Sequence, residues 1–261
     1  MIDQGSGPPL VLIPGVQGRW EYARPTVKAL SASFRVLTSS LCGEPGAGAF
    51  DLRHGLDADV HQILAALDER RIERAIICGI SFGGLVGIRF AALHPSRTAA
   101  LVAVSTPGPG WRLSERHQAF VDRPRLFGPL FVAQWPGRFG KELATSLPSV
   151  SDRAAYVLRL AGTAVRAPVS FARMAARAQL IPRLDLADDC RHIAAPTLLV
   201  TGEEGLDHVV PVGASSQYAS MIRSARVAVM KQTGHLGTVT RPLQFAALVR
   251  DFVKDAQHAA A

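Results

Sequence analysis

Short runs of apolar, mostly β-branched residues alternate along this chain with longer stretches that carry apolar residues at helical spacing. We expect strands at residues 10–13, 34–38, 75–78, 100–104, 197–200 and 225–230, and helices at residues 20–32, 57–70, 82–93, 214–222 and 242–255. The strand runs are apolar on both faces, as in parallel strands that are covered on both sides. The alternation therefore predicts an α/β fold in which helices flank a mostly parallel central sheet.

The alternation is interrupted once. After the Pro-Gly-Pro-Gly sequence of residues 107–110, no convincing strand pattern occurs until about Pro196. The intervening residues contain several prolines and carry apolar residues at helical spacing, which indicates helices rather than strands. We therefore expect a core formed by residues 1–110 and 184–261, with an inserted helical subdomain at residues 111–183.

The composition excludes several other classes of protein. With 261 residues, 48% of them hydrophobic, and 3 cysteines, the chain is not disordered, collagen-like or a small disulfide-linked scaffold. No apolar stretch reaches the ~18 residues of a membrane-spanning helix, and residues 1–5 lack the pattern of a signal peptide, so we expect a cytoplasmic protein without a membrane span. The cysteines are widely spaced and form no CxxC pair, which favours neither a disulfide framework nor a metal site.

The strongest local motif is Gly-Ile-Ser-Phe-Gly-Gly at residues 79–84, directly after a predicted strand and before a predicted helix. In this context GxSxG forms a sharp strand-to-helix turn that exposes the serine at the carboxyl end of the sheet. The alternative is a glycine-rich turn that binds a phosphate, but neither a GxGxxG continuation nor a Gly-Lys-Ser/Thr sequence is present. The motif therefore predicts that Ser81 is a nucleophile.

A serine nucleophile needs a histidine base, and the base needs a carboxylate that fixes its tautomer. Asp207 lies in the loop after the predicted strand 197–200, and His235 lies after the last predicted strand. The order Ser81, Asp207, His235 is the order expected on this type of sheet. Glu204 in the same loop remains the alternative acid.

With these motifs in this order, the chain resembles a serine hydrolase of the α/β-hydrolase fold with an inserted helical cap, of the bacterial esterase-like kind. The resemblance implies that Ser81 is the nucleophile, His235 the base and then acid, and Asp207 the orienting carboxylate. It implies no metal and no organic cofactor. The family most often has His-Gly after the first strand, where this chain has Pro14 and Gly15. Backbone amides remain available there, and we expect those of Val16 and Phe82 to form the oxyanion hole.

The family usually begins with an antiparallel pair of strands before the segment that resembles residues 5–10. Only a few residues precede that segment here, so we expect this first strand pair to be absent. An exposed sheet edge would result, and the chain is expected to be a monomer or a homodimer.

Three side chains are candidates for the substrate pocket. Gln17 and Trp20 follow the first predicted strand, and Trp111 follows the loop at which the insertion begins. Trp20 could equally be ordinary packing at a helix start. A pocket roofed by an apolar cap suits an ester with a small to medium acyl or aromatic group.

The positive charge of the chain is concentrated in the insertion. The chain has a net charge of +8, and residues 111–183 alone carry an excess of eight basic residues over acidic ones. Arg159, Arg166 and Arg173 recur every seven residues, and Arg177 follows. Such a row is usually a solvated helix face, and the competing hypothesis is that it attracts an anionic substrate. Nucleic acid is not expected, because no binding motif accompanies the charge.

The sequence thus predicts a serine hydrolase that cleaves a carboxylic ester through an acyl-enzyme on Ser81. Other activities of the same fold stay open, namely thioesterase, lactonase, carbon–carbon bond hydrolase and cofactor-free haloperoxidase. The alternative from another class is a ligand-binding or sensor protein that keeps a hydrolase scaffold with little turnover.

Overall fold

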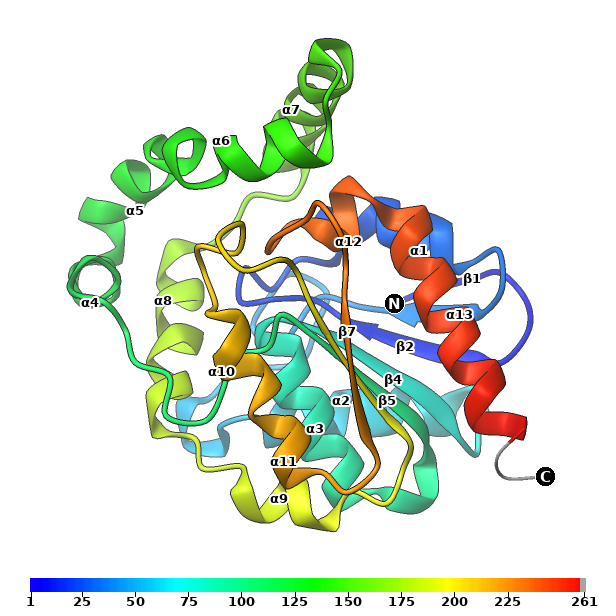
Figure 1. Ribbon diagram of the computed structural model, residues 1–261. Helices are drawn as coiled ribbons and strands as arrows, with labels where there is room; N and C mark the ends of the chain where they lie inside the picture. Colours follow the sequence, from blue (N-terminus) through cyan, green and yellow to red (C-terminus); the bar gives the residue numbers. More distant parts are fainter. Residues whose placement is uncertain (259–261) are drawn as a thin grey trace.

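The computed structural model describes residues 1–258, apart from the side chains of Arg116 and Phe131. Within this part of the chain the strands form one seven-stranded sheet in the order β1-β3-β2-β4-β5-β6-β7 (Figure 1). The strands are β1 (Ile2–Gln4), β2 (Pro9–Ile13), β3 (Arg35–Thr38), β4 (Ala75–Ile80), β5 (Thr98–Val104), β6 (Thr197–Thr201) and β7 (Ala225–Val229). Each predicted strand is found, within two residues of its predicted ends.

All neighbouring strands from β3 to β7 pair in parallel. At the edge opposite β7 lies a single three-residue strand, β1, in place of the antiparallel strand pair that the family usually has. β1 lies antiparallel to β3 with Asp3 opposite Leu37, so the sheet is mixed at this edge. Arg35 on β3 donates hydrogen bonds to both carboxylate oxygens of Asp3, at 3.0 and 2.7 Å. These contacts hold the short strand against the sheet.

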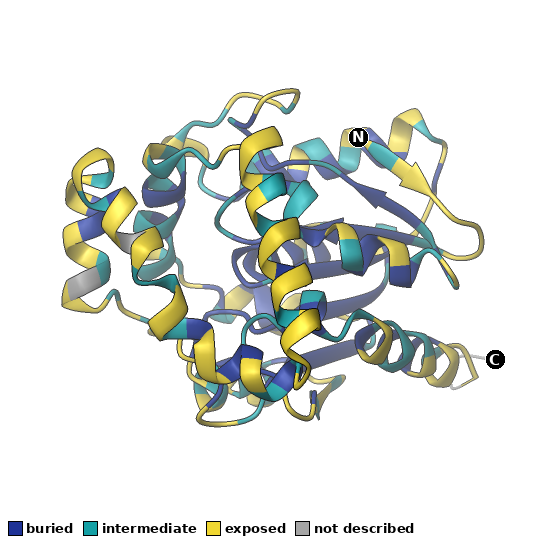
Figure 2. Ribbon diagram, turned by 90° about the horizontal axis from the view of Figure 1, so that it is seen from above, coloured by how far each residue is buried: buried dark blue, intermediate teal, exposed yellow. Residues whose placement is uncertain are grey.

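Helices cover both faces of the sheet, because the side chains of its inner strands are apolar on both sides. On one face, Leu10 and Leu12 of β2 pack with the helices η1 (Trp20–Ala23), α1 (Arg24–Leu30) and α13 (Pro242–His258). On the other face, Val11 and Ile13 pack in a second cluster with α2 (Asp57–Glu69), α3 (Phe82–Leu93), α9 (Ala187–His192) and α11 (Tyr218–Met221). Figure 2 shows the buried strands between these two helix layers.

The remaining short elements connect these layers. They are the 3-10 turns η2 (Leu52–His54), η3 (Pro95–Arg97) and η4 (Ile181–Arg183), and the helices α10 (Val212–Ser216) and α12 (Gly237–Thr240). The edge strand β7 departs from the prediction that every strand is buried on both faces, since Val227 and Val229 are 45% and 44% exposed. Only one side of β7 pairs with another strand in the sheet, which leaves its side chains less covered.

Five helices are inserted between β5 and α9, as the loss of strand pattern predicts, and we call them the inserted helices. They are α4 (Glu115–Asp122), α5 (Pro124–Ala133), α6 (Trp135–Ser146), α7 (Val150–Arg166) and α8 (Phe171–Leu180). Phe120 and Val121 of α4 pack with Met174 and Ala175 of α8 in a small apolar cluster of their own. In Figure 1, α4 to α7 lie outside the layered core. In residues 1–258, no helix combines the length and apolar character needed to cross a membrane.

Candidate active site

Ser81 is the single residue between the end of β4 at Ile80 and the start of α3 at Phe82. Its backbone has φ 54° and ψ −117°, a conformation that costs energy for any residue with a β-carbon. The backbone amide of Ser81 donates to the carbonyl of Val104 on β5, at 2.7 Å. The residue is 8% exposed, so the turn presents a nearly covered hydroxyl at the carboxyl end of the sheet.

Two glycines allow this turn to be so tight. A β-carbon on Gly79 would collide with the backbone of Gly83, and one on Gly83 would lie 2.6 Å from the carbonyl oxygen of Pro14. The start of α3 therefore lies close both to β4 and to the end of β2. This approach places the loop after β2 beside Ser81.

Val16 and Gln17 belong to that loop, which closes with a hydrogen bond from the Gly18 amide to the Gly15 carbonyl, at 2.9 Å. A β-carbon on Gly15 would lie 3.5 Å from the Ser81 β-carbon and 2.8 Å from the Gln17 side-chain oxygen. Gly15 is thus flanked by Ser81 on one side and the Gln17 side chain on another. The predicted oxyanion residue Val16 follows Gly15 directly and is half-buried.

Asp207 and His235 meet directly. His235 Nδ1 lies 3.2 Å from Asp207 Oδ2, and the two side chains are 14% and 2% exposed. The other carboxylate oxygen of Asp207 accepts hydrogen bonds from the amides of Val209 and Val210, at 3.0 and 2.9 Å. Glu204, the alternative acid, is exposed. The carboxylate that lies against the histidine is therefore Asp207.

Glycines also pack the two loops that carry this pair. A β-carbon on Gly202 would lie 2.5 Å from the Thr233 carbonyl oxygen and 2.6 Å from the α-carbon of Gly234. The loop after β6 and the loop after β7 thus touch through their backbones. This contact brings Asp207 within reach of His235 although the two are 28 positions apart.

The charges of the pair stabilise each other. Burial raises the pKa of Asp207, but His235 and the two loop amides lower it by more, so its pKa lies below the ordinary 3.8. Burial lowers the pKa of His235, but Asp207 and a second carboxylate, Glu142, raise it above the ordinary 6.5. The site therefore favours a charged carboxylate and stabilises an imidazolium beside it.

The second carboxylate is a residue that the sequence reasoning missed. Glu142, on α6 of the inserted helices, is fully buried. One of its oxygens accepts from the amides of Gly234 and Leu236, both at 2.7 Å. These amides flank His235 on either side. No sequence motif marks Glu142, because its partners are backbone groups.

Arg177 is the other buried charge that the inserted helices bring to the site. Its guanidinium donates to the carbonyls of Cys42 and Val16, at 2.8 and 3.3 Å, and pairs with Glu44 at 3.0 Å. The side chains of Arg177 and Glu44 have no exposed surface. Arg173 pairs with the same carboxylate, at 3.0 Å. The guanidinium of Arg177 thus anchors the loop that contains Val16.

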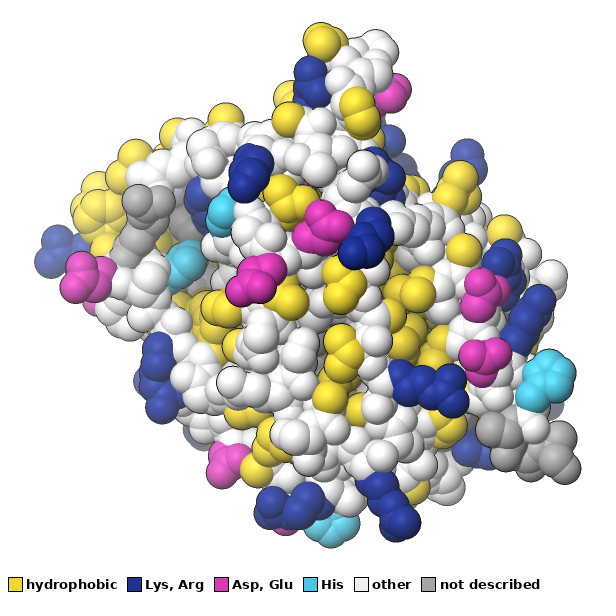
Figure 3. Space-filling model, viewed as in Figure 1, with side chains coloured by type: hydrophobic (Ala, Val, Ile, Leu, Met, Phe, Trp, Pro, Cys, Tyr) yellow, Lys and Arg dark blue, Asp and Glu magenta, His cyan; other side chains and the backbone are white. Residues whose placement is uncertain are grey.

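The interpretation of the arginine row as a solvated face is therefore wrong for Arg177. It holds for Arg159 and Arg166, which are exposed on α7. Basic side chains on the face shown in Figure 3 are scattered rather than gathered in one patch.

The two tryptophans proposed for the pocket lie in different surroundings. Trp20 packs against the core cluster beneath α1 and α13, and the guanidinium of Arg24 lies 5.3 Å from its ring centroid. Trp111 is half-buried at the start of the insertion, and its ring centroid lies 6.4 Å from that of His117. Neither ring is part of the contacts around Ser81 described above.

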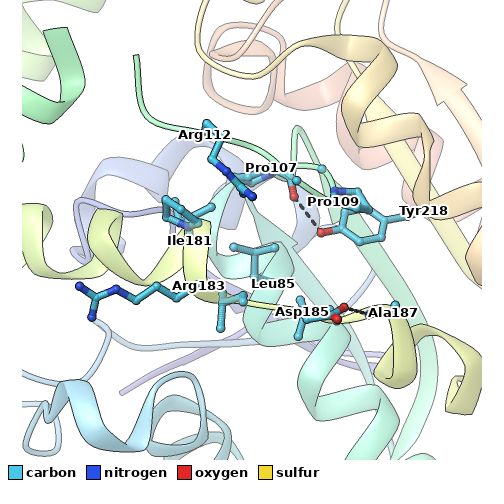
Figure 4. A pocket seen from close by; sticks show the side chains of 14 residues that line it. Leu85, Pro107, Pro109, Arg112, Ile181, Arg183, Asp185, Ala187 and Tyr218 are labelled. Atoms are coloured by element: carbon cyan, nitrogen blue, oxygen red, sulfur yellow. Dashed lines mark hydrogen bonds between the residues drawn. The ribbon is translucent and has the colours of Figure 1, made fainter. Parts of the chain in front are cut away.

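A cavity of about 370 Å³ lies where the two connections to the inserted helices meet the core. Residues 107–110 and 181–187 line it, together with Leu85 and Tyr218, whose hydroxyl donates to the Pro107 carbonyl at 2.8 Å (Figure 4). Ser81, Asp207 and His235 do not line this cavity. It belongs to the junction of the insertion and the core. In residues 1–258, no group of three or more His, Cys, Asp or Glu side chains is gathered as a metal ion would require.

Known proteins resemble this chain over nearly its whole length. A family model described as the alpha/beta hydrolase family matches residues 10–248. The chain is 29% identical over 270 residues to the 2-hydroxymuconate semialdehyde hydrolase of Pseudomonas sp. (strain CF600), which covers 99% of this chain and 91% of that protein. It is 27% identical over 246 residues to the pimeloyl-(acyl-carrier protein) methyl ester esterase of Nitrosomonas europaea, with 92% and 94% covered.

Among solved structures, the enol-lactonase from Burkholderia xenovorans LB400 is similar with a TM-score of 0.79 and 22% sequence identity. The similarity covers 97% of this chain and 95% of that chain. The two proteins therefore share a fold.

Proposed function

The chain belongs to the alpha/beta hydrolase family, and from this premise we propose that it is a serine hydrolase that cleaves a carboxylic ester through an acyl-enzyme on Ser81. The observation that carries the proposal is the hydrogen bond between His235 Nδ1 and Asp207 Oδ2, at 3.2 Å. It would hold the proton on Nδ1 and leave Nε2 free to accept a proton, as a general base requires. The strained turn at Ser81 supports the same assignment, because such strain is typical of this kind of nucleophile.

In the first half of the reaction, Ser81 Oγ attacks the ester carbonyl carbon while its proton moves to His235 Nε2. The carbonyl oxygen becomes negatively charged, and the amides of Val16 and Phe82 stabilise it as the oxyanion hole. One such donor is typically worth about 3 kcal/mol of transition-state stabilisation. The bond to the alcohol oxygen then breaks, His235 gives its proton to the leaving alcohol, and the acyl group stays on Ser81.

In the second half, His235 removes a proton from a water molecule, whose oxygen attacks the acyl carbon. The intermediate collapses, the carboxylic acid leaves, and Ser81 Oγ regains its proton from His235. Asp207 stays ionised throughout and stabilises the imidazolium twice in each cycle. No external oxidant, reductant or co-reactant other than water enters this sequence.

The inserted helices act as a cap over this site, with residues 111–183 as its extent. Gln17 beside Ser81 and Trp111 at the start of the cap are the side chains proposed to contact the substrate. The packing of Trp20 against the core favours a structural role for that ring. The proposed substrate is an ester with a small to medium acyl or aromatic group, and similarity to a methyl ester esterase favours an ester.

A second candidate substrate for the same residues is 2-hydroxymuconate semialdehyde. It is favoured by the 29% identity to a 2-hydroxymuconate semialdehyde hydrolase over 99% of this chain. The same activated serine would take part in both reactions, but the bond that breaks differs: an ester loses its alcohol from a carbon–oxygen bond, whereas this substrate is cleaved at a carbon–carbon bond and its carbon leaving group must gain a proton.

The proposal is tested by incubating the protein with a fluorophosphonate and measuring its intact mass, followed by peptide mapping. We expect one stoichiometric adduct on Ser81 and none in Ser81→Ala. Turnover of p-nitrophenyl esters of graded chain length, beside turnover of 2-hydroxymuconate semialdehyde, then identifies the substrate class. Folded protein without an adduct would contradict the proposal. Ligand affinity that is retained in Ser81→Ala without turnover in the wild type would instead favour the binding-protein alternative.

A further inference from the structure

Glu142 reaches from the cap into the loop that carries His235. One carboxylate oxygen accepts hydrogen bonds from the amides of Gly234 and Leu236, at 2.7 Å each. Two amides on either side of one residue are thus fixed by a single side chain. This arrangement holds the backbone on both sides of His235.

The same stretch of α6 makes further contacts with this loop. The hydroxyl of Ser146, one helical turn after Glu142, donates a hydrogen bond to the Gln232 carbonyl at 2.8 Å. Arg241 at the end of α12 donates to the Ser146 carbonyl at 3.2 Å. Polar contacts thus join the end of α6 to the chain before His235, at Gln232, and after it, at Arg241. The two amides that Glu142 binds lie between these two points in the sequence.

Glu142 lies in a buried part of the inserted helices. The side chain is fully buried, and its helix neighbours Phe139 and Leu143 are each less than 10% exposed. Its second carboxylate oxygen is buried without a hydrogen-bond partner in the described part of the chain. A buried polar atom without a partner normally destabilises a fold, so a carboxylate at this position calls for an explanation other than stability.

We propose that Glu142 is a positioning residue that orients His235 through the backbone and stabilises the imidazolium that forms during turnover. The inference rests on the proposed function, because it assigns His235 as the proton acceptor. Asp207 fixes the ring from its Nδ1 side, and Glu142 fixes the loop from the cap. The histidine is therefore held from two separate parts of the chain.

The charges around the pair act in the direction that the proposal requires. Burial raises the pKa of Glu142 to about 7, while the two amides and His235 lower it and Asp207 raises it. Burial raises the pKa of the Tyr156 phenol on α7, and the charge of Glu142 raises that pKa further. On His235, Asp207 and Glu142 raise the pKa, whereas burial and Arg138 lower it. An ionised Glu142 thus favours a positive charge on the ring.

The test compares Glu142→Gln with Glu115→Gln. The first variant keeps the shape and one oxygen that can accept from the two amides but removes the charge, and the second removes an exposed carboxylate from the same cap. Two quantities are measured for each: the pKa of His235 by NMR titration of its ring, and the pH profile of kcat/KM with a neutral p-nitrophenyl ester.

In Glu142→Gln we expect the pKa of His235 to fall and the acid limb of the pH profile to move to lower pH with it. On the plateau above that limb, kcat/KM is expected to fall severalfold, because the imidazolium that forms in the transition state loses a neighbouring negative charge. Glu115→Gln should match the wild type in both quantities. An unchanged His235 pKa and pH profile in Glu142→Gln would overturn the proposal and leave Glu142 with a structural role only.

If Glu142→Gln does not fold, Glu142→Asp replaces it. This variant keeps the charge but withdraws the oxygen by one methylene, so the pKa of His235 should stay near the wild-type value while kcat falls. Wild-type kcat in Glu142→Asp would overturn the positioning role. The NMR titration also separates the two proposals, since it reports on His235 even if the fluorophosphonate adduct on Ser81 is not found and the proposed function fails.

Discussion

Gly234 lies against the backbone at Asp207: a β-carbon on Gly234 would come within 2.8 Å of the Asp207 amide nitrogen and would collide with the Leu206 carbonyl. This contact between the two loops brings Asp207 to within 3.2 Å of His235. The geometry of the pair therefore depends on the absence of a single carbon atom next to His235.

Gly234→Ala tests this dependence. The added methyl group should push the two loops apart, lower the free energy of unfolding by about 1–3 kcal/mol, and lower kcat/KM because the hydrogen bond from His235 to Asp207 lengthens. Gly213→Ala is the matched control, because Gly213 lies in α10 with no atom near the position of its missing β-carbon. We expect that variant to be as stable as the wild type or slightly more stable. Equal activity and stability in both variants would contradict the argument.

The backbone at Ser81 predicts an unusual order of stabilities. At φ 54° and ψ −117°, a residue with a β-carbon is strained by about 1–3 kcal/mol, whereas glycine adopts such angles readily. Ser81→Gly and Ser81→Ala both lose the hydroxyl and should both lose activity, but Ser81→Gly should melt at the higher temperature. Thermal unfolding of the two variants, with far-UV circular dichroism as the probe, measures the difference. A higher melting temperature for Ser81→Ala would show that the turn is not strained.

Arg177 should be needed for stability as well as for activity. Arg177→Met leaves Glu44 buried with Arg173 as its remaining ion-pair partner, and breaking a buried pair typically costs about 3–5 kcal/mol. Arg166→Met, which removes an exposed arginine from the same cap, should stay within about 0.5 kcal/mol of the wild type. Denaturant unfolding measures both changes.

A double variant isolates the cause of that loss. Removing the charge of Glu44 as well, in Arg177→Met with Glu44→Gln, should recover part of the lost free energy. Additive losses in the double variant would mean that the two side chains are not coupled.

The pH dependence of activity follows from the charges around His235. The imidazole must be neutral to accept the serine proton, and its pKa lies above the ordinary 6.5, because the neighbouring carboxylates outweigh the effect of burial. Activity should therefore be lost as the pH falls, with a midpoint in kcat/KM above pH 6.5.

Asp207→Asn should move that midpoint to lower pH and lower kcat by about 10⁴-fold, through the wrong tautomer of His235. Glu204→Gln is the control in the same loop and should change neither quantity, because Glu204 is exposed. If Glu204→Gln shifts the profile and Asp207→Asn does not, the acid has been assigned to the wrong residue.

Much of the fold follows from the sequence because buried parallel strands have a strong signature. The strand before Ser81 begins at Ala75, as predicted, and extends two residues further, to Ile80. The local sequence pattern determines helix ends less well. The predicted helix 20–32 is divided near Pro25 into η1 and α1. The predicted helix 214–222 begins two residues earlier than predicted and is interrupted at Gln217. These breaks depend on tertiary packing, which periodicity does not describe.

The same difference between predictable and unpredictable features applies to the residues of the candidate site. Ser81, Asp207 and His235 could be singled out as candidates because each lies after a predicted strand, and the structure brings Asp207 and His235 together. Glu142 and Arg177 could not, because charged residues on amphipathic helices are nearly always exposed and nothing in a single sequence marks the exceptions. The structure is needed to show that these two side chains point from the cap into the core.

The contacts of Glu142 and Arg177 also bear on attempts to give this protein a new specificity by exchanging residues 111–183 for the cap of a relative. An exchange of this kind treats the cap as an independent module that only lines the pocket. Here the exchange would remove the side chains that hold the loops of His235 and Val16. A chimaera should therefore fold poorly or lose activity unless the donor cap supplies a carboxylate and a guanidinium at the same two places.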